Sequence, residues 1–267
     1  MTPAGAFALG SVVLSALLVG CEPPAAPTPP QAAIEFDHGH PLLRDFLGRH
    51  VRKGLVDYPC FKDGDPDLDQ YLALAGRVPR SQFDGWSAPQ RLAFLLNTYN
   101  ASMLRLVARH YPLDNVRAIG GVRSVWKMSV VELFGRWHSL DDLEHGMIRR
   151  QFKTPQIHFA LVCGARSCPP LRDEPYTATN LEAQFAEQAR AFLADPVKNR
   201  VDWDRKVVHL SPLFRWYAED FGKSEEELLR FIASSYSAAE AEALRGGGFT
   251  IRYNEYDWSP NAVPPEK

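Results

Sequence analysis

The longest run of helical spacing lies between Ser87 and Tyr111. Apolar residues recur there three or four positions apart, as one face of a helix requires: Leu92, Leu96, Tyr99, Met103 and Leu106. Ser87 and Gln90 have the spacing of a capping box, and Pro89 stands in the first turn, where its missing N–H costs little. Because Pro112 cannot continue a helix, we expect this helix to end at Tyr111.

Shorter patterns of the same kind predict further helices. They cover residues 41–53, 67–77, 140–152, 179–195 and 211–222, and a last one begins at Ser224. Several starts carry N-cap signals: Ser139, Thr179 with Glu182, Ser211 before Pro212, and Ser224 with Glu227.

Three segments predict strands. Residues 156–163 form a continuous apolar run broken only by His158, which we interpret as a buried strand. Residues 201–203 and 206–210 have the pattern of a hairpin, and 249–253 follow a glycine turn. The chain shows no internal repeat. These elements together predict an α/β or α+β class: a single compact domain with a small central sheet flanked by several helices.

The N-terminal residues have the composition of a targeting segment. Ala6–Val19 is almost wholly apolar, and the sequence LVGC at 18–21 resembles the lipobox of bacterial lipoproteins, although residues 1–10 contain no Lys or Arg. The resemblance implies export, lipidation at Cys21 as the membrane anchor, and a place in the outer membrane facing the periplasm. A plain cleaved signal or a transmembrane anchor are the alternatives.

The domain boundaries follow from this assignment. We expect a signal peptide over residues 1–21, a tether rich in Pro and Ala over 22–33, the globular domain over 34–260 and a C-terminal tail over 261–267.

Composition excludes several functional classes. Hydrophobic residues make up 45% and charged residues 23% of the chain, and the net charge is −2, so no basic surface for nucleic acid is expected. The sequence has no glycine-rich phosphate loop and no His-Glu-x-x-His motif, so we expect no cofactor and no metal. The partner classes that remain are an envelope substrate and an envelope protein, and the sequence does not identify either.

Five blocks of sequence carry a family resemblance. They are LAFLLNTYNA (92–101), SLDDLEHGMIR (139–149), QIHFALVCGARSCPPLRDEPYTATNL (156–181), LSPLFRWYAEDFG (210–222) and YDWSPN (256–261). In this order they resemble the family catalogued as domain of unknown function 547. The resemblance implies a fold but no established reaction. Family members that lack the second cysteine favour Cys163 over Cys168 as the residue with a required role. Cys60 lies outside the blocks.

Cys163 ends the predicted strand and is followed by the loop 164–167. A thiol at a strand end, before a loop with free backbone N–H groups, is a common arrangement for a nucleophile. Arg166 is placed to lower the thiol pKa or to bind an anionic group of a substrate. The alternatives are a small buried hydrophobic residue, a disulfide between Cys163 and Cys168, and a zinc site of both cysteines with His145.

A cysteine nucleophile needs a base, and two histidines compete for that role. Five steps along a strand separate His158 from Cys163 by roughly 16 Å and place the two on opposite faces. His145 on the preceding helix is therefore the predicted base, with Asp141 on its face and Glu144 as a separate acid. The alternative for His145 is an ordinary histidine on a helix surface.

Two asparagines complete the predicted site. Asn100 shares an apolar helix face, where its amide needs a partner: either a catalytic histidine or a loop backbone. Asn97 is assigned to substrate binding. The aromatic residues at 214, 216, 217 and 221 have helical spacing and are interpreted as core.

Three functions remain open on this basis. The first is a cysteine-dependent hydrolase or acyltransferase, papain-like or transglutaminase-like, with Cys163 as nucleophile. The second is a non-catalytic binding module of the cell envelope. The third is a thiol–disulfide protein that uses Cys163 and Cys168.

Overall fold

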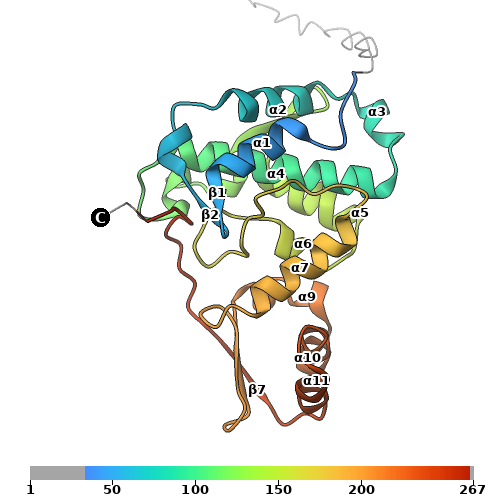
Figure 1. Cartoon of the computed structure of the whole chain (residues 1–267), viewed down its shortest axis with the longest axis vertical. Helices are drawn as coiled ribbons and strands as arrows, with labels where there is room; N and C mark the ends of the chain where they lie inside the picture. Colours follow the sequence, from blue (N-terminus) through green and yellow to red (C-terminus); the bar gives the residue numbers. More distant parts are fainter. Residues whose placement is uncertain (1–33, 265–267) are drawn as a thin grey trace, which may run out of the picture. The chain divides into compact units, whose positions relative to one another are not determined.

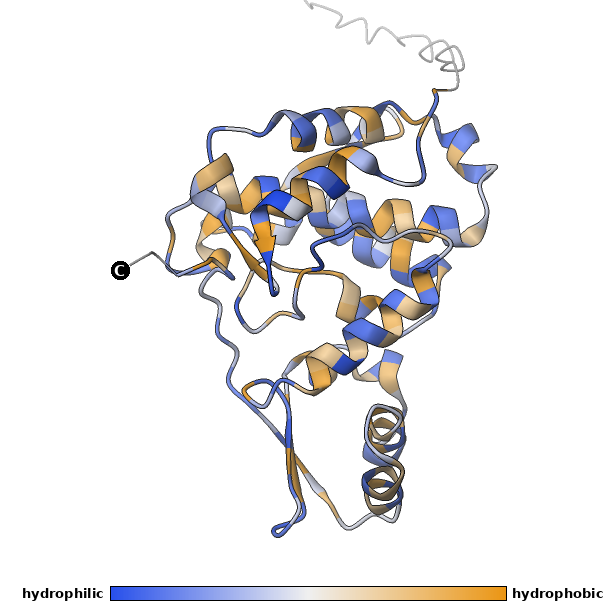
Figure 2. Cartoon of the chain, viewed as in Figure 1, coloured by the Kyte–Doolittle hydropathy of each residue, from blue (hydrophilic) through white to orange (hydrophobic). Residues whose placement is uncertain are grey.

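The long helix α4 (Ala88–His110) organises the fold of residues 34–264, the part of the chain that the computed structural model describes. Helix α2 (Pro66–Arg77) contacts both α1 (Pro41–His50) and α4, as Figure 1 shows. Hydrophobic and hydrophilic residues alternate along these helices, as expected for elements with one buried face (Figure 2). Sixteen residues of α4 are buried, because α4 is covered on most of its sides.

The remaining helices are mostly short. Among the described residues they are η1 (Tyr58–Phe61), α3 (Arg80–Asp84), η2 (Val116–Gly120), η3 (Val125–Lys127), η4 (Asp142–Ile148), α5 (Arg149–Gln151), α6 (Ile157–Ala160), α7 (Leu181–Leu193), α8 (Leu213–Trp216), α9 (Ala218–Phe221), α10 (Glu225–Ala233) and α11 (Ala238–Arg245).

The strands of the described residues form three small sheets. β1 (Val51–Arg52) pairs with β2 (Leu55–Val56), and β3 (Ser129–Leu133) pairs with β4 (Arg136–Ser139), both antiparallel. In the third sheet, β5 (Arg200–Asp202) is antiparallel to β6 (Val207–Leu210), and β6 is parallel to β7 (Thr250–Tyr253). The mixed class of helices and strands that the sequence predicts is confirmed, with the sheets lying around a helical core.

Buried side chains gather in two hydrophobic clusters. The larger one surrounds α4, and the smaller one joins α7, α10, α11 and the third sheet. Helix α6 belongs to both, because Ile157 and Ala160 pack in the first cluster and Phe159 in the second. The segment after α6 therefore lies where the two clusters meet.

Several local predictions are confirmed. Ser87 and Gln90 form the capping box of α4, and its C-cap is Tyr111. Ser139 and Asp142 cap the predicted helix 140–152 through the Ser139 hydroxyl, and Ser224 caps α10. Other details differ: Asn180 rather than Thr179 is the N-cap of α7, and the predicted helix 211–222 is divided into α8 and α9.

The predicted strand at 156–163 is wrong. Residues Ile157–Ala160 form the helix α6, and the backbone becomes extended at Leu161. A short apolar run does not distinguish a buried strand from a buried helix, and here contacts with distant residues decide between them. The side chain of Asn100 bonds to the backbone of Ala160 and Val162, which fixes the exit from the helix.

The chain end packs further than expected. The sequence predicts a tail over residues 261–267, but the Val56 amide donates to the carbonyl of Asn261, and the amide of Val263 donates to the carbonyl of Val56. The Tyr58 hydroxyl also donates to the Asn261 side chain. The signal, the tether and Cys21 lie outside the described residues. None of the described helices is long and apolar enough to cross a membrane.

The buried His40 predicts a pH-dependent stability. Burial lowers the pKa of His40 from its ordinary value of 6.5 to about 3. As the pH falls below 6.5, the unfolded chain binds a proton that the folded chain does not, so stability is lost in that direction. Each pH unit is worth up to about 1.4 kcal/mol, so the loss from this residue between pH 7.5 and 5 is about 2 kcal/mol.

Urea denaturation at pH 7.5 and at pH 5.0 measures this loss. The variant His40→Asn should show a smaller difference between the two pH values, because asparagine does not titrate and tolerates the positive φ of 51° found here. His110→Asn at an exposed position is the control and should keep the wild-type difference. An unchanged difference in His40→Asn would exclude His40 as the cause.

Candidate functional site

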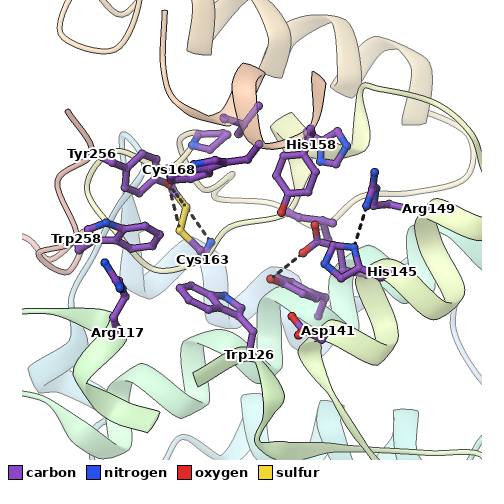
Figure 3. Close-up of a pocket in the computed structure, with 17 residues that line it drawn as sticks. Arg117, Trp126, Asp141, His145, Arg149, His158, Cys163, Cys168, Tyr256 and Trp258 are labelled. Atoms are coloured by element: carbon purple, nitrogen blue, oxygen red, sulfur yellow. Dashed lines mark hydrogen bonds between the residues drawn. A yellow bond between two sulfur atoms is a disulfide. The ribbon is translucent and has the colours of Figure 1, made fainter. Parts of the chain in front are cut away.

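A pocket of about 430 Å³ opens where the two hydrophobic clusters meet. It is lined by a disulfide, by charged side chains and by aromatic rings, which come from segments far apart in the sequence (Figure 3). A cavity of this size suits a small molecule or a short peptide segment.

A π-helical turn places two polar residues at the pocket. In η4 the amide of Arg149 donates to the carbonyl of Glu144, five residues earlier. Turns of this kind are rare and occur often at functional sites. The Ser139 hydroxyl and the Asp142 carboxylate hold the start of the turn, and Glu144 and His145 line the pocket.

Glu144 is a buried carboxyl group. Only 6% of the residue is exposed, and the Tyr99 hydroxyl lies 3.4 Å from its Oε2. Burial raises the pKa of Glu144, and a hydrogen bond from the Tyr217 hydroxyl together with nearby positive charge opposes part of that rise. The protonated form is therefore favoured more than in a solvent-exposed glutamate.

His158 lies in a network of charged residues on the same side of the pocket. Its Nε2 is 2.6 Å from Asp220, and its ring stacks on Tyr217 at 3.9 Å between centroids. Arg149 pairs with both Asp220 and Glu219. Burial lowers the pKa of His158 to about 4, although Asp220 acts in the opposite direction, so the ring is neutral at pH 7.

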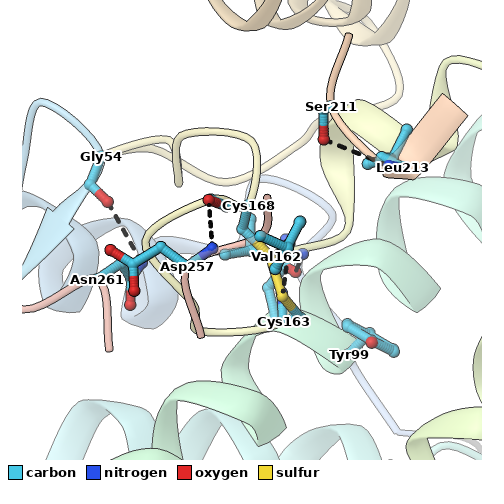
Figure 4. Close-up of a disulfide and its surroundings, with 12 residues drawn as sticks. Gly54, Tyr99, Val162, Cys163, Cys168, Ser211, Leu213, Asp257 and Asn261 are labelled. Atoms are coloured by element: carbon cyan, nitrogen blue, oxygen red, sulfur yellow. Dashed lines mark hydrogen bonds between the residues drawn. A yellow bond between two sulfur atoms is a disulfide. The ribbon is translucent and has the colours of Figure 1, made fainter. Parts of the chain in front are cut away.

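Cys163 and Cys168 form a disulfide that lines the pocket (Figure 4). Cys163 is partly exposed, whereas Cys168 is only 4% exposed. The sulfur of Cys168 accepts hydrogen bonds from the Cys163 amide at 2.9 Å and from the Tyr256 hydroxyl at 3.3 Å. The Tyr256 hydroxyl also lies 3.3 Å from the Cys163 sulfur.

The conformation of Gly164 and two backbone hydrogen bonds hold the loop between the two cysteines in place. Gly164 has φ of +76°, and a Cβ there would come within 2.9 Å of Val107, so only glycine fits. The amide of Arg166 donates to the carbonyl of Ser259, and the amide of Ser167 donates to the carbonyl of Asp257. These two amides are therefore not free to bind an oxyanion.

Aromatic rings form one wall of the pocket. Trp216 stacks on Trp258 at 5.6 Å, Tyr256 lies 4.4 Å from Trp258, and Trp126 meets Trp258 edge-on at 5.6 Å. We call these four residues the aromatic wall. Trp216 is 45% exposed, which is a large apolar surface to leave in water and suits a binding site.

The predicted site residues are only partly brought together. Cys163, Cys168, Glu144 and His145 line one pocket, but the structure records no hydrogen bond between Cys163 and His145. The Nδ1 of His145 accepts a hydrogen bond from Arg149 at 3.1 Å, and its expected partner Asp141 makes no hydrogen bond with it.

The other predicted residues have roles in the backbone framework. Asn100 binds the carbonyl of Ala160 and the amide of Val162, and Asn97 binds both backbone groups of Tyr176. Of the two partners considered for Asn100, the structure provides the loop backbone. Arg166 donates to the carbonyl of Ala262, and the free thiol of Cys60 is exposed. Neither residue lines the pocket.

Several residues that line the pocket are not indicated by the sequence. The predicted strand would turn His158 away from Cys163, but these residues begin with the helix α6, and both His158 and Cys163 line the pocket. The helical spacing predicts core positions for Trp216 and Tyr217 as for Phe214 and Phe221, yet Trp216 and Tyr217 line the pocket. Within residues 34–264, no group of three or more His, Cys, Asp or Glu residues is arranged to hold a metal ion.

Comparison with known families agrees with the sequence blocks. Residues 83–193 match the family described as Protein of unknown function, DUF547. The resemblance expected from the blocks at 92–101, 139–149 and 156–181 is thereby confirmed over this range. The DUF547 segment supplies Tyr99, Glu144 and the disulfide, whereas Trp216, Tyr256 and Trp258 follow it in the chain. No curated protein and no solved structure matches the chain.

Proposed function

We propose that this protein exchanges thiols and disulfides at Cys163–Cys168. The observation that carries the proposal is the unequal setting of the two sulfurs in one pocket. Cys163 is partly exposed, whereas Cys168 is buried and accepts a hydrogen bond from the Cys163 amide; the Tyr256 hydroxyl lies 3.3 Å from both sulfurs. This setting suits attack at Cys163 with Cys168 as the leaving group, because donors stabilise a departing thiolate.

The reaction balances in two steps. A substrate thiolate attacks the sulfur of Cys163, the bond to Cys168 breaks, and its electron pair stays on Cys168 as a thiolate. A second thiolate of the substrate then attacks the substrate sulfur that is bonded to Cys163 in the mixed disulfide. Cys163 leaves as a thiolate. The substrate is oxidised to a disulfide and the protein is reduced by two electrons; the reverse sequence reduces a substrate disulfide.

The contacts favour exchange over acyl transfer. A cysteine hydrolase needs a base at the nucleophile and free donors for an oxyanion. In the described part of the chain, the hydrogen-bond partner of the Cys163 sulfur is the Tyr256 hydroxyl, and the amides of Arg166 and Ser167 are already paired. Disulfides persist in oxidising compartments, so the proposal also fits the predicted export and lipid anchor at Cys21.

Reduction of the folded protein tests the proposal. Oxidised protein is incubated with dithiothreitol without denaturant, quenched with an alkylating reagent and weighed by mass spectrometry. We expect Cys163 and Cys168 to become alkylated while circular dichroism keeps its native form, and oxidised dithiothreitol to restore the disulfide. A disulfide that resists reduction until the protein unfolds is a structural link only and would refute the proposal.

A further inference from the structure

Two charged side chains in the pocket have neither an ion pair nor a hydrogen bond within the described residues. Arg117 lies over the ring of Trp258 at 5.3 Å, and no described carboxylate pairs with it. Asp141 begins the π-helical turn and, among residues 34–264, its carboxylate has neither an ion pair nor a hydrogen bond. In contrast, Arg149 at the same pocket is paired with Glu219 and Asp220.

The two unpaired groups have opposite signs and line the same cavity (Figure 3). A ligand with a single charge would leave one of the two unmatched, whereas a ligand with a carboxylate and an ammonium matches both. The aromatic wall lines the same cavity and offers apolar contact for the middle of such a ligand.

We infer that the pocket takes a short peptide thiol, or its disulfide, with both termini free. Its carboxylate would pair with Arg117, its ammonium with Asp141, and its sulfur would meet Cys163. This inference rests on the proposed exchange function and names its substrate class. The volume of about 430 Å³ suits a di- or tripeptide. A cysteine inside a folded protein lacks the two terminal charges.

Four forms of the tripeptide Gly-Cys-Gly separate the two contacts. They are the free peptide, the N-acetylated peptide, the C-amidated peptide, and the peptide blocked at both ends. For each form, the second-order rate constant for opening the Cys163–Cys168 disulfide is measured after an acid quench by mass spectrometry. Each variant is compared with the wild type on the same peptide, so the reactivity of the peptide thiol cancels.

Each variant is expected to affect only two of the four peptides. Arg117→Gln should lower the rate constants of the two peptides with a free carboxylate by about tenfold and leave the amidated ones unchanged. Asp141→Asn should lower those of the two peptides with a free amine by about tenfold and leave the acetylated ones unchanged. Arg215→Gln is the control, because this guanidinium lies over Tyr253 outside the pocket and all four rate constants should stay the same.

The outcomes distinguish this inference from the function on which it rests. If both variants lower all four rate constants equally, or neither lowers any, the substrate class is refuted. In that case, exchange with the fully blocked peptide still supports the proposed function. If none of the four peptides opens the wild-type disulfide in the folded protein, the proposed function is itself refuted.

Discussion

Replacing Cys168 with serine is expected to leave a reactive thiol at the pocket, whereas replacing Cys163 is expected to leave an unreactive one. The reason is burial: Cys168 is only 4% exposed, while Cys163 is partly open to the pocket. With an aromatic disulfide reagent that releases a coloured thiol, Cys168→Ser should react at least about tenfold faster than Cys163→Ser, since exchange depends on access to the sulfur.

The other cysteines of the chain must be replaced before the two reaction rates are compared. Cys60 is an exposed free thiol and would react in every variant, so both are made with Cys60→Ser and Cys21→Ser. Comparable far-ultraviolet circular dichroism shows that both variants are folded. Faster reaction of Cys163→Ser would mean that Cys168 is the accessible sulfur, and the proposed direction of attack would then be wrong.

Replacing Asn100 with alanine is expected to destabilise the protein by about 3 kcal/mol, because two buried backbone groups lose their partners. The side-chain amide of Asn100 donates to the carbonyl of Ala160, and its oxygen accepts from the amide of Val162, each at 2.9 Å. Both backbone groups belong to buried residues. Urea denaturation of the oxidised protein measures the free energy of unfolding.

Asn97→Ala is the matched control for this variant. Asn97 lies on the same helix and also makes two bonds to one backbone segment, at Tyr176, so a similar loss of stability is expected. Only Asn100 holds the residue next to Cys163, so only Asn100→Ala should also change the rate at which thiols open the disulfide. Equal exchange rates in the two variants would show that Asn100 stabilises the fold without positioning the site.

Much of the fold follows from local sequence. The capping box at Ser87, the spacing of apolar residues and Pro112 are signals within one segment, and α4 forms where they predict it. The segment 156–163 has no such signal. Its helix is held by residues far away in the chain, since His158 bonds to Asp220 and Asn100 bonds to the backbone after the helix.

The candidate site, too, is indicated only in part by local sequence. Glu144, His145 and the cysteines lie in blocks whose composition indicates chemistry, and they line one pocket. Tyr256 and Trp258 lie in an irregular segment and Arg117 in the short helix η2, and only the folded chain brings the three to one pocket. Trp216 belongs to a run with helical spacing, so periodicity alone does not reveal that it is half exposed.

The most direct test of the account is to locate the first bond that forms in the wild-type protein. The oxidised chain reacts briefly with Gly-Cys-Gly without denaturant, is quenched in acid and is digested, and the peptides are identified by mass spectrometry. We expect the tripeptide on Cys163 and a free thiol at Cys168, because Cys168 is the buried sulfur and accepts a hydrogen bond from the Cys163 amide. A mixed disulfide on Cys168, or none before the protein unfolds, would contradict the account.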